Sequence, residues 1–210
     1  MIFERFSKDN PAIYLITDGS LNSANYTKKS AGFLETIRFA VASEINLIQI
    51  REKNLPAKLL YEIAAKSAEI TRNSQTKILI NDRADIAWAA GADGVHLTSD
   101  SVSAKIIRQK FPLELIIGIS VHSLKEAEIA KAQKADFVTF SPIFDTPSKA
   151  FYGKPQGLIK LREVCEKLKP FPVFALGGID ETNLFEVLNC GAIGYAAIRY
   201  LNEMIRQEEI

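Results

Sequence analysis

Short apolar segments recur along this 210-residue chain, and a stretch with loop and helix signals follows each of them. The segments are almost continuously hydrophobic, which is typical of parallel strands that are covered on both faces. Their starts lie roughly twenty to forty residues apart, enough for a crossover helix between parallel strands. The predicted strands are residues 13–17, 47–51, 77–81, 94–97, 115–120, 137–140, 173–176 and 193–196.

Helix signals fill the intervals between these segments. Pro56 suits the first position of a helix over residues 57–72, where apolar residues return every three or four positions. Ser123 and Glu126 form a capping box before residues 127–133, in which the Glu is expected to reach back to the amide of the cap. Further helices are expected from residue 84 to near 91, from near 158, and over 183–189, the last opened by Asp180 or Thr182 and ended by Gly191.

Eight strand–helix units predict an α/β fold, a single (β/α)8 barrel that occupies residues 1–210 as one domain. The alternative is a doubly wound open sheet, which usually carries a glycine-rich phosphate turn after its first strand. Here the first strand runs into Asp18-Gly19, whereas the pair Gly177-Gly178 follows the seventh strand. The barrel is favoured because its phosphate sites commonly form after strands seven and eight.

The overall charge excludes some classes of partner. A formal net charge of +1 argues against a general nucleic-acid or membrane-surface binder. Cys165 and Cys190 have no metal-ligand spacing and are interpreted as small core residues in a reducing compartment. The start of the sequence lacks a signal-peptide pattern, and no run approaches the roughly 18 apolar residues that span a bilayer. We therefore expect a soluble, cytoplasmic protein; whether it forms homo-oligomers stays open.

One long loop stands out, between the predicted strand at 137–140 and the helix that opens near 158. Most connections in compact domains have a median of roughly 4–6 residues, so a loop of this length is typically functional or disordered. Its hydroxyls, Thr146 and Ser148, and the ammonium group of Lys149 suit an anionic substrate. A solvated surface loop is the alternative.

Polar side chains also follow the second and third strands. Gln49, Arg51 and Lys53 share one face by the two-residue alternation, although Arg51 and Lys53 can instead lie beyond the strand and face water. Asn81 offers an amide to a heterocycle, and Asp82 offers a hard oxygen to Mg²⁺ or serves as a helix N-cap.

The later strands end in further candidates. Asp100 is a second possible Mg²⁺ ligand or the cap of the next helix, and Ser120 and His122 alternate onto one face, where His122 can move protons near neutral pH. His96, inside an apolar strand, is interpreted as structural. The bare amides of Gly177-Gly178 and the guanidinium of Arg199 suit a phosphate monoester, while a surface Arg paired with a carboxylate is the alternative.

In this order these motifs resemble the thiamine phosphate synthase family. The resemblance runs from about residue 12 to 200 and rests on these segments: Gln49-Ile-Arg-Glu-Lys53, Asn81-Asp82, Gly94-Val-His-Leu97, Gly118-Ile-Ser-Val-His122, residues 141–149, Gly177-Gly178-Ile179 and Gly191-Ala192. The resemblance implies a (β/α)8 barrel that uses Mg²⁺ to couple hydroxymethylpyrimidine diphosphate to a thiazole phosphate with release of diphosphate.

The resemblance also implies roles for single residues. The pyrimidine diphosphate would be held by Gln49, Arg51, Lys53 and Asn81, and the magnesium by Asp82. The departing diphosphate would be contacted by Ser120 and Lys149. The thiazole would be contacted by Thr146 and Ser148, and its phosphate by Gly178, Ile198 and Arg199. The family's second metal carboxylate corresponds to Ser101, which leaves Asp100 as the nearest acid. Arg199 replaces a small hydroxyl residue.

Two alternatives remain open. Ser120-Val121-His122 is also similar to the related thiazole tautomerases, in which the His does acid–base work on a carboxythiazole phosphate. Asp82 and Lys53 favour the synthase, because a tautomerase holds neither metal nor diphosphate. The third hypothesis is a catalytically silent barrel that binds a thiamine precursor or a protein partner as a regulator.

Overall fold

The computed structural model describes residues 3–146 and 154–208. Parallel strands ordered β1 to β8 form a closed barrel and alternate with helices, which confirms the predicted (β/α)8 fold. The strands are β1 (Ala12–Ile16), β2 (Leu47–Ile50), β3 (Lys77–Asn81), β4 (Gly94–Leu97), β5 (Ile116–Val121), β6 (Phe137–Phe140), β7 (Val173–Leu176) and β8 (Gly194–Ala197). The helices are α1 (Tyr26–Ala42), α2 (Ala57–Thr71), α3 (Ala84–Ala89), α4 (Ala104–Lys110), α5 (Leu124–Ala132), α6 (Gly157–Leu168), α7 (Leu184–Leu188) and α8 (Arg199–Glu208).

The chain divides into two compact units. The β1–β4 unit comprises Tyr14–His96, Lys110–Ile116 and Ile198–Ile210. The β5–β8 unit comprises Met1–Ile13, Leu97–Gln109 and Ile117–Ala197. None of the helices in the described part of the chain is both long and apolar enough to cross a membrane.

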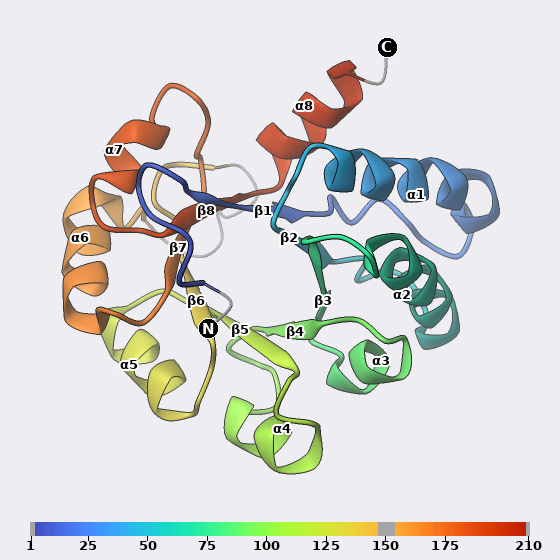
Figure 1. Ribbon diagram of the computed structural model, residues 1–210, viewed down its shortest axis with the longest axis horizontal. Coiled ribbons are helices and arrows are strands. Elements are labelled where there is room, and N and C mark those ends of the chain that lie inside the picture. Colours follow the sequence, from blue (N-terminus) through green and yellow to red (C-terminus); the bar gives the residue numbers. More distant parts are fainter. Residues whose placement is uncertain (1–2, 147–153, 209–210) are drawn as a thin grey trace. The chain divides into compact units, whose positions relative to one another are not determined.

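In the β1–β4 unit, the strands pair in parallel so that Gln49 of β2 lies between Ile16 of β1 and Leu79 of β3. Helices α1, α2 and α3 lie side by side outside these strands (Figure 1). Helix α2 buries one stripe, Leu60, Ile63, Ala64, Ser67, Ala68 and Thr71, because its apolar residues return every three or four positions. The strands themselves are buried on both faces, which explains their continuous hydrophobicity.

In the β5–β8 unit, β5, β6, β7 and β8 pair in parallel in that order, and α5, α6 and α7 cover them (Figure 1). The predicted capping box opens α5, which begins at Leu124 rather than at residue 127. Ser123 Oγ accepts the Glu126 amide, but Glu126 Oε2 accepts the amide of His122, one residue before the cap. Glu126 therefore ties the α5 start to the end of β5.

An aromatic cluster closes the amino ends of β6 and β7. Phe3, Phe137 and Phe174 pack edge to face, with ring centroids 5.2–5.7 Å apart. Phe3 is only 6% exposed although it lies outside the strands. The segment before β1 is thus part of the core of the β5–β8 unit.

Candidate functional site

Five of the predicted residues lie at the carboxyl ends of the neighbouring strands β2 and β3 in the β1–β4 unit, namely Gln49, Arg51, Lys53, Asn81 and Asp82. Strand β2 ends at Ile50, one residue earlier than predicted, so Arg51 and Lys53 lie beyond the strand. Arg51 is half-buried and Lys53 is exposed. Within the described chain neither side chain has an ion-pair partner, which leaves both charges available to an anion.

Gln49 is held from inside the barrel by a residue that the sequence analysis missed. Its Nε2 donates to the Tyr14 hydroxyl over 3.0 Å, and that hydroxyl lies 3.0 Å from His96 Nδ1. All three side chains are at most 2% exposed. Burial raises the pKa of Tyr14, so the phenol keeps the proton that it can donate to His96. His96 therefore has the structural role expected for it, and a lone Tyr in an aliphatic strand was the signal for Tyr14.

At the end of β3, Asn81 is half-buried and Asp82 is exposed. Asp82 adopts a left-handed backbone with φ of 63°, unusual for a residue other than glycine. The N-cap interpretation of Asp82 is wrong, because Arg83 occupies that position and no side chain caps the helix. Arg83 instead forms a bidentate pair with Asp85, at 2.8 and 2.6 Å.

Ile198 and Arg199 mark the start of α8 in the same unit. Ile198 is half-buried, and its carbonyl accepts Asn202 Nδ2, which also donates to Ile16 O. Arg199 is the first residue of the helix and is exposed. The alternative of a surface Arg paired with a carboxylate is not observed within the described residues.

In the β5–β8 unit, the turn after β4 holds Asp100 and Ser101. Asp100 is exposed, whereas Ser101 Oγ accepts the Thr98 amide over 2.7 Å and lies 3.1 Å from Thr98 Oγ1. At the position where the resemblance implies a metal carboxylate, this chain therefore has a turn-closing hydroxyl. A pocket of about 240 Å³ lies beside this turn, with Ser120 in its lining.

Ser120 and His122 both face β6. Ser120 Oγ lies 3.3 Å from Thr139 Oγ1, and His122 Nδ1 lies 2.7 Å from the Ser141 carbonyl oxygen. A carbonyl oxygen only accepts, so this contact requires the proton on Nδ1 and leaves the lone pair of the neutral ring on Nε2. Both side chains are half-buried.

The long loop after β6 is tied at its base. The Gln156 amide donates to Pro142 O over 2.7 Å, and the Gly157 amide donates to Ile143 O over 3.1 Å. Thr146 is half-buried at the last described position before residues 147–153. Ser148 and Lys149 lie outside the described residues, so their predicted roles stay predictions.

Gly177 and Gly178 pack against the start of this loop. The amides of Ile143 and Phe144 donate to Leu176 O and Gly177 O, both over 3.0 Å. A Cβ at Gly178 would lie 2.8 Å from Phe144 Cβ, and the φ of 66° is itself strained for any residue with a side chain. Only glycine fits here, because the loop approaches the backbone so closely.

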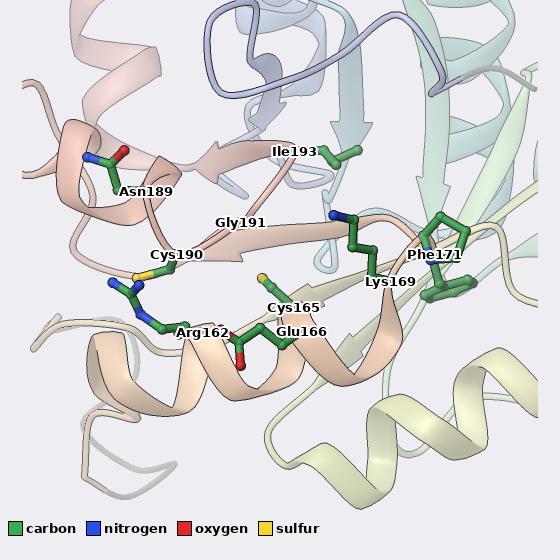
Figure 2. A pocket seen from close by; sticks show the side chains of 10 residues that line it. Arg162, Cys165, Glu166, Lys169, Phe171, Asn189, Cys190, Gly191 and Ile193 are labelled. Carbon is green, nitrogen blue, oxygen red and sulfur yellow. The ribbon is translucent and has the colours of Figure 1, made fainter.

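A second, larger pocket of about 400 Å³ lies at the amino ends of β7 and β8 (Figure 2). Cys165 and Cys190 lie in its wall, both buried as predicted. Burial raises the pKa of the Cys165 thiol to about 12, and it raises that of Cys190 although Arg162 beside it acts in the opposite direction. None of the predicted site residues lines this pocket.

The residues present fit a magnesium ion that substrate helps to hold. Mg²⁺ is usually bound through one or two carboxylates together with substrate phosphates rather than by a cage of protein ligands. The Asp82 carboxylate is exposed at a strand end and accepts no hydrogen bond from the described residues. The described residues also contain no group of three or more His, Cys, Asp or Glu side chains that would hold a metal without substrate.

Known proteins of one family match this chain along most of its length. The sequence model of the thiamine monophosphate synthase family matches residues 13–201. A relative from Geobacter sulfurreducens is 42% identical over 187 residues, which cover 89% of this chain and 84% of that protein. The thiamine-phosphate synthase of Syntrophomonas wolfei is 36% identical over 190 residues, which cover 90% of this chain and 88% of that protein.

A solved structure extends the agreement to the fold. Thiamine phosphate pyrophosphorylase from Pyrococcus furiosus matches with a TM-score of 0.77 at 31% identity, covering 95% of this chain and 98% of that one. The motifs at the strand ends predicted the same family from the sequence. The chain belongs to the thiamine monophosphate synthase family.

Proposed function

We propose that this protein is a thiamine-phosphate synthase, which couples hydroxymethylpyrimidine diphosphate to a thiazole phosphate and releases diphosphate. The observation that carries the proposal is the family match over residues 13–201, which includes every strand end described above. Relatives that bear this name are matched over most of their own length, so the whole barrel is shared.

The β1–β4 unit supplies the groups proposed for the pyrimidine diphosphate. Gln49 donates one N–H to the Tyr14 hydroxyl, and no donor in the described chain bonds its Oε1. This oxygen can therefore accept a hydrogen bond from the amino group of the pyrimidine. Asn81 presents a second amide at the neighbouring strand end. Arg51 and Lys53, unpaired with any described carboxylate, would bind the diphosphate.

The remaining predicted residues are proposed for the leaving group and the thiazole phosphate. Ser120 and Lys149 would contact the departing diphosphate, and Thr146 and Ser148 the thiazole ring. Gly178 is exposed, and a glycine amide suits a phosphate oxygen. In the other unit, Ile198 and Arg199 form a cationic helix start, which also suits a phosphate monoester.

Asp82 is the proposed magnesium ligand, and Asp100 is the candidate for a second one. Bound Mg²⁺ would neutralise charge on the oxygens of the departing diphosphate. The left-handed backbone of Asp82, held by its amide donating to His96 O over 2.9 Å, keeps its carboxylate beyond the end of β3.

To catalyse this reaction the protein must position the two substrates and stabilise the negative charge on the departing diphosphate. Expelling diphosphate leaves a carbocation-like centre on the methylene of the electron-rich pyrimidine, and the thiazole nitrogen attacks that carbon. Cationic side chains stabilise the negative charge that develops on the departing oxygens, and ordered binding brings the nitrogen near the carbon. This reaction requires no nucleophile from the protein.

The proposal is tested with purified protein and both substrates. We expect diphosphate release that requires the pyrimidine diphosphate, the thiazole phosphate and Mg²⁺ together. Replacement of Arg51 by Ala should raise the KM for the pyrimidine diphosphate, whereas replacement of Arg199 by Ala should raise the KM for the thiazole phosphate. Equal effects of both variants on both KM values would contradict the assigned roles.

The His122 ring favours one competing activity. Because the Ser141 carbonyl fixes the proton on Nδ1, Nε2 of neutral His122 has the lone pair that a tautomerase base needs. Interconversion of carboxythiazole phosphate tautomers without metal, abolished in His122→Asn, would identify the tautomerase. Ligand binding without either reaction would identify a regulatory barrel.

A further inference from the structure

Glu52 lies in the sequence between two residues proposed to bind diphosphate, yet its own side chain is buried. Glu52 is 2% exposed, while Arg51 is half-buried and Lys53 is exposed. Burying a carboxylate costs free energy unless hydrogen bonds compensate for the water it loses. No cation of the described residues pairs with Glu52, so other donors must stabilise it.

Those donors all come from one loop, between β1 and α1. Oε1 accepts the Thr17 hydroxyl over 2.6 Å and the Gly19 amide over 3.2 Å, and Oε2 accepts the Leu21 amide over 2.8 Å. Burial raises the pKa of the Glu52 carboxyl, and these hydrogen bonds oppose that rise. Glu52 therefore ties the loop after β1 to the segment after β2.

The same network reaches the backbone of Arg51. Thr17 Oγ1 donates to Glu52 and at the same time accepts the Arg51 amide over 2.9 Å. Further along, Asn22 and Asn54 form an isolated parallel bridge between the same two segments. The backbone that carries Arg51 and Lys53 is thus bonded on both sides of Glu52.

The direction of the Glu52 side chain also affects charge. An exposed Glu between two cations would neutralise them and repel a diphosphate. With its carboxylate turned into the β1–α1 loop, Glu52 leaves Arg51 and Lys53 without a carboxylate partner among the described residues.

We propose that Glu52 is a positioning residue, whose buried carboxylate locks the β1–α1 loop onto the segment after β2 and so orients Arg51 and Lys53 for the diphosphate of the substrate. This inference rests on the proposed function. It adds a residue that touches no substrate, together with Thr17, its partner.

The test compares Glu52→Gln with Thr17→Val and the conservative Thr17→Ser. Glutamine keeps the shape but presents N–H groups to donors, so we expect the KM for the pyrimidine diphosphate to rise about tenfold, on the order of one lost hydrogen bond to a charged group. In Glu52→Gln the KM for the thiazole phosphate should stay within about twofold of that of the unchanged protein. Thr17→Val should behave like Glu52→Gln, because it removes the hydroxyl that donates to Glu52. Thr17→Ser keeps this hydroxyl and should behave like the unchanged protein. Glu69→Gln, on the exposed face of α2, is the matched control.

A purely structural role would give a different pattern. Loss of folded protein lowers the apparent kcat and leaves both KM values unchanged, and that result with Glu52→Gln would overturn the proposal.

Two further measurements do not need turnover. Amide hydrogen exchange at Gly19 and Leu21 should accelerate in Glu52→Gln, and inorganic diphosphate should bind about tenfold more weakly than to the unchanged protein. Unchanged exchange and unchanged diphosphate affinity would each refute the proposal. If the unchanged protein binds diphosphate but does not couple the two substrates, the proposed function fails while the role of Glu52 is still decided.

Discussion

Replacement of Tyr14 by Phe tests the hydrogen-bond chain inside the β1–β4 unit. The change keeps the ring and removes the hydroxyl that accepts Gln49 Nε2 and lies 3.0 Å from His96 Nδ1. A buried polar group that loses its partner costs about 1–3 kcal/mol of free energy of unfolding. For a domain of this size each kcal/mol shifts Tm by about 2–4 °C, so we expect Tm to fall by about 2–12 °C.

The assay is thermal unfolding followed by circular dichroism, with Tyr61→Phe as the matched control. Tyr61 lies on α2 and is 43% exposed, so its hydroxyl is accessible to water and its loss should change stability by less than about 0.5 kcal/mol. We also expect Tyr14→Phe to raise the KM for the pyrimidine diphosphate, because the Gln49 amide loses the bond that orients it. A Tm shift no larger than that of Tyr61→Phe would refute the reasoning.

Three further predictions concern the loops around the strand ends. Partial burial raises the pKa of the Asp18 carboxyl, but hydrogen bonds from Ser20 and the ion pair with Arg206 outweigh burial and lower the pKa. The ion pair therefore stabilises the fold at pH values above the ordinary Asp pKa of about 3.9. This stabilisation is lost as pH falls through the lowered pKa. Arg206→Gln should therefore be less stable at pH 7 in urea unfolding, by an amount that shrinks as pH falls through the lowered pKa of Asp18. A difference that stays constant as the pH is lowered would contradict this. Gly178→Ala would introduce a strained and crowded Cβ, so we expect a higher KM for the thiazole phosphate and a lower Tm. Gly32→Ala is the control, because a Cβ at that position meets nothing within 4 Å, and it should leave KM unchanged and not lower Tm. Equal KM values for the two variants would count against the crowding argument. Lys149→Ala should slow turnover at an unchanged Tm, and an unchanged rate would remove Lys149 from the mechanism.

The barrel was predictable because most of its strands are buried on both faces. Segments such as 77–81, 94–97, 137–140 and 173–176 are nearly continuous apolar runs, and the observed strands have these same bounds. Other ends shifted by one residue: β2 ends at Ile50 rather than at Arg51, because backbone pairing between strands sets where a strand ends and hydropathy does not report that pairing. Ser123 was predicted to cap α5, because this side-chain chemistry is local and needs no tertiary contact, but the helix begins at Leu124 rather than at residue 127.

The buried polar network was not predictable, because long-range packing creates it. Glu52 follows Arg51 and precedes Lys53, and a charged run of this kind is typical of solvated surface. It is buried only because the loop between β1 and α1, more than thirty residues earlier in the sequence, brings its donors over the carboxylate. Tyr14 was missed for the same reason, since its partners Gln49 and His96 come from two other strands.

The most direct test of the account is the stoichiometry of the coupled reaction. Purified protein, both substrates and Mg²⁺ should yield one diphosphate for each thiamine phosphate formed, with neither product when one substrate is omitted or the metal is chelated. Diphosphate release without the thiazole phosphate, or no thiamine phosphate from the complete mixture, would contradict the proposed function.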